Sequence, residues 1–189
     1  VIPNRGAWLE LEMDSNDVFY VRIDKNRKFP CTTFLRSIGL STDEMLKEKF
    51  GDDPRITVTI DSGKDNTKNE EEALLEVYRK LRPGEPATVD SARTTLDNLF
   101  FDAKRYDLSR FGRYKYNKKL GIASRIAGMK AAETVIAPLT GEILVEENEL
   151  ITREKAMEIQ NAGVLEMAVH KVESEGIAKV VGNGMVDIK

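Results

Sequence analysis

The stretch Ala7–Asp24, AWLELEMDSNDVFYVRID, predicts a β-hairpin near the start of the chain. Residues Ala7–Met13 alternate between apolar and acidic side chains, which is the period of a strand with one buried face. Residues Val18–Asp24 are rich in β-branched and aromatic side chains, which favour strands. The polar segment Asp14–Asp17 between the two runs is typical of a turn.

Trp8, the only tryptophan, lies in the alternating run. Alternation places it on the face shared by Glu10 and Glu12, opposite Leu9 and Leu11. Two interpretations stay open: a core residue of the hairpin, or an exposed platform on which an unpaired base stacks. The two acidic neighbours favour the exposed position.

Capping residues and apolar spacing predict helices after the hairpin. Pro30 begins a helical stretch that Gly39 ends, and Thr42 caps a short helix that Gly51 closes. By contrast, the β-branched run Ile56–Ile60 is predicted to be a strand.

The strongest helical signal is Glu70–Leu81, where apolar residues recur with helical spacing. The segment Arg82–Pro86 ends this helix because a proline restricts the residue before it and a glycine permits a positive φ. Thr88 caps a further helix that runs to about Phe100. In Phe111–Leu120 basic residues alternate with aromatics, which predicts a strand or an exposed ribbon.

The balance of charged residues and the pattern of apolar residues both change near residue 130. Residues 1–130 carry 24 Lys and Arg against 21 Asp and Glu, whereas residues 131–189 carry 5 against 11. The second part contains short apolar runs around one helix capped by Thr152. We therefore predict an α+β fold: a mixed helix and hairpin domain at 1–125, followed by a small β-rich module at 126–189.

The composition excludes several classes of protein. No apolar run approaches the ~20 residues that span a bilayer. Cys31 and His170 are the only cysteine and the only histidine, so neither a disulfide nor a cysteine–histidine metal site is predicted. A single cysteine fits a reducing, cytoplasmic setting. The start at Val1 suggests that the chain lies within a longer protein.

Two basic clusters with interspersed aromatics are candidates for nucleic-acid binding, because cations neutralise phosphates and aromatic faces stack on bases. The alternative is a solvated charged face with core aromatics behind it. The first cluster comprises Arg22, Lys25, Arg27, Lys28 and Arg36. The second comprises Lys104, Arg105, Arg110, Arg113, Lys115, Lys118 and Lys119.

Three stretches resemble the lobe, or second β domain, of the β subunit of bacterial DNA-directed RNA polymerase. They are Val1–Glu10 (VIPNRGAWLE), Val21–Pro30 (VRIDKNRKFP) and Ala73–Leu120, which includes LRPGEP, KRYDL and GRYKYNKKL. The resemblance implies a part of a nucleotidyltransferase that acts in transcription. It also implies that the isolated piece, which forms part of the wall of the DNA cleft, makes no RNA itself.

The resemblance also implies roles for individual residues. Trp8 is expected to stack on an unpaired base of the non-template strand, with Asp24 and Lys25 beside it. Lysine at 25 stands where the family commonly has arginine, so a bidentate contact is not expected there. Further DNA contacts are suspected for Arg22 and Arg27. The gate loop of the family, which faces the clamp across the cleft, corresponds to Arg82, Pro83, Gly84, Glu85 and Pro86.

Residues 131–189 resemble a lineage-specific insertion of the lobe, a barrel-sandwich-hybrid module, through Glu133–Val135 and Thr140–Leu144. The implied partners are DNA (the non-template strand and the downstream cleft), the β′, α and ω subunits and a sigma factor, in the bacterial cytoplasm at the nucleoid. No cofactor is expected in this piece, since the magnesium of the parent enzyme is bound by another subunit. The rival hypothesis is a protein-interaction scaffold whose acidic module docks a regulator or another subunit.

Overall fold

The computed structural model describes residues 1–172 and 176–182. It divides into two compact units, Val1–Gly112 and Arg113–Lys189, here called the first and the second unit. The predicted boundary at 125/126, and the status of the second part as an insertion, stay predictions.

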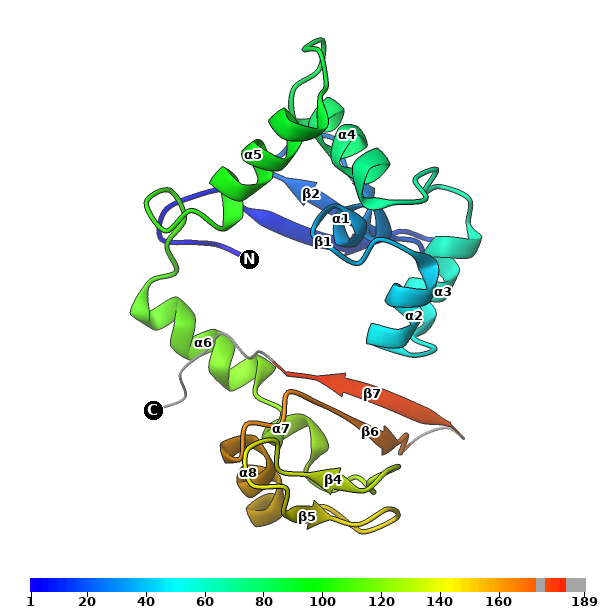
Figure 1. Ribbon diagram of the computed structural model, residues 1–189, viewed down its shortest axis with the longest axis vertical. Coiled ribbons are helices and arrows are strands. Elements are labelled where there is room, and N and C mark those ends of the chain that lie inside the picture. The colour runs from blue at the N-terminus through cyan, green and yellow to red at the C-terminus, as the bar shows by residue number, and fades with distance from the viewer. Residues whose placement is uncertain (173–175, 183–189) are drawn as a thin grey trace. The chain divides into compact units, whose positions relative to one another are not determined.

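The first unit begins with the predicted hairpin (Figure 1). Strands β1 (Leu9–Met13) and β2 (Phe19–Ile23) pair antiparallel, and the short β3 (Phe29–Pro30) pairs with the other edge of β2. The turn between β1 and β2 is held by the Asp14 carboxylate, which accepts hydrogen bonds from the backbone N–H groups of Asn16 and Val18. The hairpin prediction is confirmed.

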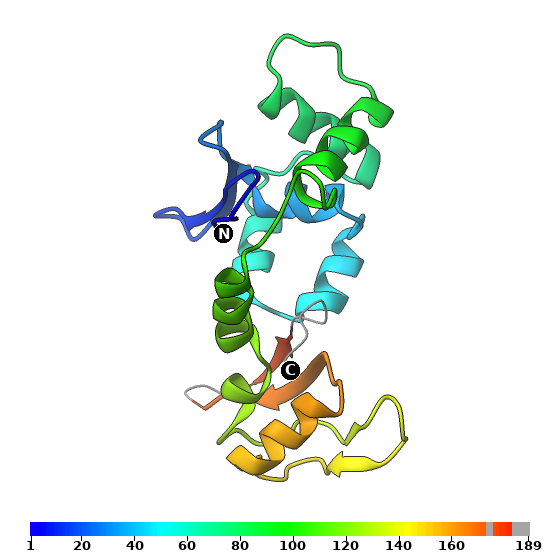
Figure 2. The same cartoon turned by 90° about the vertical axis from the view of Figure 1, so that its left-hand side faces the viewer.

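Five helices follow in the first unit. They are α1 (Cys31–Ser37), α2 (Asp43–Phe50), α3 (Pro54–Asp61), α4 (Glu70–Leu81) and α5 (Val89–Phe100). Thr42 and Thr88 cap α2 and α5 as predicted, by accepting hydrogen bonds from backbone N–H groups in the first helical turn. Figures 1 and 2 show the connection between α4 and α5 standing out from both helices.

The prediction of a strand at Ile56–Ile60 is wrong, because this segment lies inside α3. Asp53 caps the helix by accepting a hydrogen bond from the N–H of Arg55, and Pro54 occupies the first turn, where its missing N–H costs nothing. The buried residues Ile56 and Thr59 share one helical face. Capping and tertiary packing therefore outweigh the β propensity of the branched side chains.

The core of the first unit lies between the sheet and the helices. Val21 and Ile23 of β2 and Phe29 of β3 are almost fully buried, together with Leu74 and Val77 of α4. Burying an aliphatic or aromatic side chain of this size contributes about 1.5–3 kcal/mol to folding. The core thereby fixes the hairpin against α4, which precedes the 82–86 loop.

Helix α6 (Arg110–Leu120) occupies the segment that was predicted to be a strand or ribbon, so that prediction is wrong. The segment RFGRYKYNKKL contains no β-branched residue, whereas arginine, lysine and leucine are good helix formers. Alternation of basic and aromatic residues thus gave a misleading strand period.

The second unit has its own core and contains α7 (Ala123–Ile126), β4 (Val135–Ile136), β5 (Ile143–Val145), α8 (Arg153–Asn161), β6 (Glu166–His170) and β7 (Ile177–Val181). In the described part of the chain, β4–β5 and β6–β7 form separate two-stranded sheets that do not close into a barrel. Thr152 caps α8 as predicted, whereas α7 was not predicted. The α+β class is confirmed. Among the described residues no helix is long and apolar enough to cross a membrane.

Candidate nucleic-acid interface

Trp8 and Asp24 are joined by two hydrogen bonds. The Asp24 carboxylate accepts one from the backbone N–H of Trp8 (2.7 Å), and the backbone N–H of Asp24 donates the other to the Trp8 carbonyl (3.0 Å). The indole is 45% exposed. The predicted exposure of Trp8 is confirmed, and its backbone is held while its ring stays accessible.

Asp24 and Lys25 form the centre of a tight turn, here called the Asp24 turn (Ile23–Asn26). The N–H of Asn26 donates to the carbonyl of Ile23 (3.0 Å). Asp24 and Lys25 have φ values of 48° and 62°, in the left-handed region that hairpin turns usually fill with asparagine or glycine. Such strain persists where surrounding contacts over-determine the conformation, and the bonds from Asp24 to Trp8 are contacts of that kind.

The 82–86 loop (Arg82–Pro86) is also built on a tight turn. The N–H of Glu85 donates to the carbonyl of Arg82 (3.3 Å), and Gly84 has a φ of 86°. Proline followed by a glycine with positive φ is the signature of a type II turn. The positive φ of Gly84 is the one that the sequence allowed for. The Tyr78 hydroxyl of α4 donates to the Glu85 carboxylate (2.9 Å), which raises the pKa of Tyr78 and fastens the loop to the helix.

The Asp24 turn and the 82–86 loop line one cavity of about 430 Å³. Ile23, Asp24 and Asn26 contribute from the turn, and Arg82, Pro83 and Glu85 from the loop, with Leu81, Thr95 and Leu99 completing the wall. The structure therefore brings two sequence-predicted groups together. Nothing in the sequence alone indicated that they share a surface.

The first basic cluster does not act as one surface. Lys25 and Arg27 are exposed and, within residues 1–172 and 176–182, have no ion-pair partner. Arg22 (3.5 Å) and Lys28 (2.9 Å) instead share the carboxylate of Glu12, whose pKa the hydrogen bond from Lys28 lowers. Two cations beside the Asp24 turn thus remain available for phosphate groups.

Arg36 was wrongly grouped with the surface cations, because it is only 3% exposed. Its guanidinium binds the buried Asp65 carboxylate (3.2 Å between Nε and Oδ2) and also pairs with Asp43. The sequence carries no mark of this burial, since the acidic partners lie on other elements.

The second basic cluster lies on α6 and the loop before it. Arg105 pairs with Asp102 (3.5 Å) in that loop. The remaining basic residues on the helix are exposed: Arg110, Arg113, Lys115, Lys118 and Lys119. Phe111 (66% exposed) and Tyr114 (62%) lie among them. The composition of this helix suits a polyanion, although helical geometry replaces the predicted ribbon.

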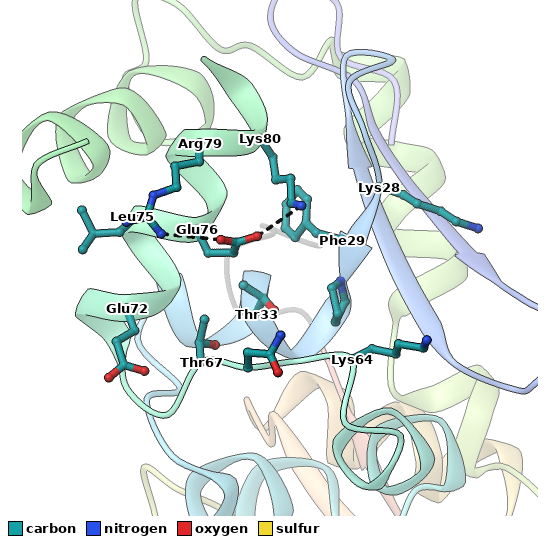
Figure 3. A pocket seen from close by; sticks show the side chains of 12 residues that line it. Lys28, Phe29, Thr33, Lys64, Thr67, Glu72, Leu75, Glu76, Arg79 and Lys80 are labelled. Carbon is teal, nitrogen blue, oxygen red and sulfur yellow. Dashed lines mark ion pairs between the residues drawn. The ribbon is translucent and has the colours of Figure 1, made fainter. Parts of the chain in front are cut away.

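A second cavity of about 400 Å³, which the sequence did not indicate, lies between α4, β3 and the loop before α4 (Figure 3). Its charged lining residues are Lys28, Lys64, Glu72, Glu76, Arg79 and Lys80. Glu76 pairs with Lys80 (3.2 Å) and Arg79 (3.7 Å), and the Glu72 carboxylate accepts a hydrogen bond from the N–H of Lys68. Most of these charged side chains therefore have partners on or next to α4 and stabilise this helix, so the cavity is a weak candidate for a ligand site.

Within residues 1–172 and 176–182, neither Cys31 nor His170 is part of a set arranged for nucleophilic catalysis. Burial raises the pKa of the Cys31 thiol to about 12, so the thiol stays predominantly protonated at neutral pH and is a poor nucleophile. His170, in the other unit, lies 3.1 Å from the Asn148 side chain. Among the described residues, no group of three or more His, Cys, Asp and Glu could hold a metal ion.

Comparison with known proteins agrees with the resemblance seen in the sequence. Residues 1–137 match the family described as RNA polymerase Rpb2, domain 2. The chain is 57% identical over 188 residues to the DNA-directed RNA polymerase subunit beta of Clostridium novyi, and 57% over 189 residues to that of Alkaliphilus metalliredigens. Each match covers 100% of this chain and 15% of the relative, so the chain spans about one seventh of the relatives' length. The chain therefore belongs to the RNA polymerase Rpb2 domain 2 family, within the bacterial β subunits.

Proposed function

We propose that the first unit forms part of the wall of the DNA cleft in a bacterial DNA-directed RNA polymerase, where it holds an unpaired base of the non-template strand. The observation that carries the proposal is the fixed but exposed Trp8, whose anchor Asp24 also lines the cavity shared with the 82–86 loop. A base that stacks on Trp8 would have its neighbours beside this cavity.

The charges near the Asp24 turn fit that role. Lys25 and Arg27 are exposed cations that would neutralise phosphates on either side of the stacked base. Separately from that turn, the exposed basic helix α6, most of which belongs to the second unit, would add sequence-independent contacts to the DNA backbone. Arg82 and Glu85 would act as the rim of the cleft, facing its opposite wall.

The chain would contribute binding and guidance rather than chemistry. Nucleotide transfer would use magnesium held by another subunit, and the assembly would include the β′, α and ω subunits and a sigma factor at the bacterial nucleoid. Purified chain supplied with template, nucleotides and magnesium is accordingly expected to make no RNA.

Intrinsic fluorescence tests the stacking role directly, because Trp8 is the only tryptophan. Single-stranded DNA titrated into the full chain should quench the emission as a base stacks on the indole. In Trp8→Ala, affinity for labelled single-stranded DNA should fall roughly five- to 150-fold, the equivalent of losing one stacked base. Binding should also weaken as salt rises, since phosphate contacts release counterions.

The rival hypothesis, a scaffold with little DNA contact, makes opposite predictions for the same titration. Quenching would be absent, and Trp8→Ala would bind DNA as the parent chain does. Melting of Trp8→Ala serves as the control: loss of a buried tryptophan costs about 3–5 kcal/mol, whereas an exposed one should leave stability close to normal.

A further inference from the structure

The second unit has an apolar groove beside α8. A cavity of about 690 Å³ lies between this helix and the β4–β5 hairpin. Ala137 and Leu144 are buried in its floor, while Met157 is 47% and Leu139 92% exposed at its edge. Leu139 lies in a turn, and no side chain in the described part of the chain covers it.

Every charged residue in the described lining of this groove is acidic. These residues are Glu142, Glu154 and Glu158. The nearby Lys155 pairs with Glu158 (2.9 Å), and its pKa is raised by that hydrogen bond, against a smaller effect of desolvation, and by the charges of Glu149 and Glu142. With Glu142, Glu154 and Glu158 in its lining and Lys155 paired to one of them, the groove keeps an excess of acidic side chains.

Apolar side chains with an acidic rim do not suit DNA, because phosphates would be repelled. They suit a peptide segment whose apolar side chains enter the groove and whose lysines or arginines face the rim, since charge complementarity sets the choice of partner. Methionine adds adaptability, because its unbranched side chain fills differently shaped gaps.

We propose that this groove, here called the acidic groove, binds a short apolar segment flanked by lysine or arginine in a partner protein. The net charge of −6 over residues 131–189 would attract such a segment from a distance. This function goes beyond DNA contact by the first unit and does not depend on it.

The probe is a labelled amphipathic peptide of leucine and lysine, titrated into the full chain and followed by fluorescence anisotropy. A peptide of leucine and glutamate tests the charge requirement, and one of serine and lysine tests the apolar requirement. The leucine–lysine peptide should bind at least about tenfold more tightly than either control. Only this peptide has both the apolar side chains that enter the groove and the positive charges that face its acidic rim.

Substitutions locate the binding site. Leu139→Ser, combined with Met157→Ser, should weaken binding of the leucine–lysine peptide about tenfold or more. The matched control is Leu165→Ser, an exposed leucine of the same unit outside the groove. Glu154→Gln should weaken binding and reduce its dependence on salt, whereas Glu147→Gln, exposed and outside the groove, should not.

Three results would overturn the proposal. Equal losses in the groove and control variants would show non-specific attraction, and equal affinity for the leucine–glutamate peptide would remove the charge argument. If sedimentation showed a dimer of the chain that Leu139→Ser dissociates, the occupant would be a second copy instead. None of these variants should change single-stranded DNA binding, so the proposal fails or stands separately from the DNA-binding role.

Discussion

Asp24 connects backbone strain to the position of an aromatic ring. Its φ of 48° is unfavourable for a residue with a side chain, yet its carboxylate and its N–H both bind the backbone of Trp8. Aspartate tolerates the left-handed region better than most residues, because its short polar side chain bonds locally. The residue type at this position therefore serves both the turn and the placement of the indole.

Asp24→Ala is expected to lower the free energy of unfolding by about 1–2 kcal/mol, because the hydrogen bond to Trp8 is lost and alanine is strained at this φ. Asp24→Asn retains an acceptor and tolerates the left-handed region, so it should lose less. Urea denaturation measures both values, and the emission of Trp8 reports on the ring. The exposed Asp52→Ala serves as the control. Equal stability of Asp24→Ala and the parent chain would show that Asp24 does not hold Trp8.

At the scale of elements, one buried carboxylate fastens the loop before α4 to α1. The side chain of Asp65 is 1% exposed and accepts hydrogen bonds from the hydroxyls of Thr32 and Thr67 (2.6 Å each) and from Arg36 (3.2 Å). Burial alone would raise the pKa of Asp65, but the hydroxyl donors outweigh it and hold this pKa below its ordinary value.

This pKa shift predicts an acid-sensitive first unit. A carboxyl group with a lower pKa in the folded state than in the unfolded state stabilises the fold above its unfolded pKa, near 4. That contribution is lost as the pH falls through the folded pKa. Asp65→Asn should cost about 3 kcal/mol at neutral pH, since it leaves Arg36 with only Asp43. It should also flatten the pH dependence below about pH 4. Denaturation curves at several pH values measure this, and an unchanged acid slope in Asp65→Asn would contradict it.

The sequence predicted the start of a helix correctly where a single capping residue determines it. The caps Thr42, Thr88 and Thr152 were identified because a hydroxyl acceptor at a helix start acts over only a few residues. The strand predicted at Ile56–Ile60 failed because β-branching is a weak preference that packing reverses. Helix α6 was missed because its segment was assigned from a short alternation of basic and aromatic residues. All described side chains of this helix are exposed, so it has no buried apolar face that would have revealed a helical period.

At the scale of the whole chain, the candidate site depends on proximity that local patterns do not contain. Sequence resemblance identified Trp8, Asp24 and the 82–86 loop, but not the cavity that the latter two share. Burial of Arg36 was equally invisible, because its partner Asp65 is brought close only by folding. The acidic balance of the second part was readable from composition, whereas the groove between α8 and β4–β5 required the arrangement of the elements.

Two separate cores predict two separate unfolding events. Leu74 is buried in the core of the first unit and Ile159 in that of the second, and none of the described residues belongs to both clusters. Because Ile122 and Ala123, which precede residue 125, are buried in the second core, the independent first unit should end near Gly112 rather than at residue 125. Leu74→Ala and Ile159→Ala should each cost about 2–5 kcal/mol, since each leaves a cavity in a packed interior.

Hydrogen exchange read by mass spectrometry should show Leu74→Ala accelerating exchange only in α1, α4 and α5, and Ile159→Ala only in α8 and the strands of the second unit. Exposed Leu165→Ala, which leaves no cavity, is the control. If either core substitution accelerated exchange equally in both units, they would unfold as one cooperative body, and the division at Gly112 would have no energetic meaning.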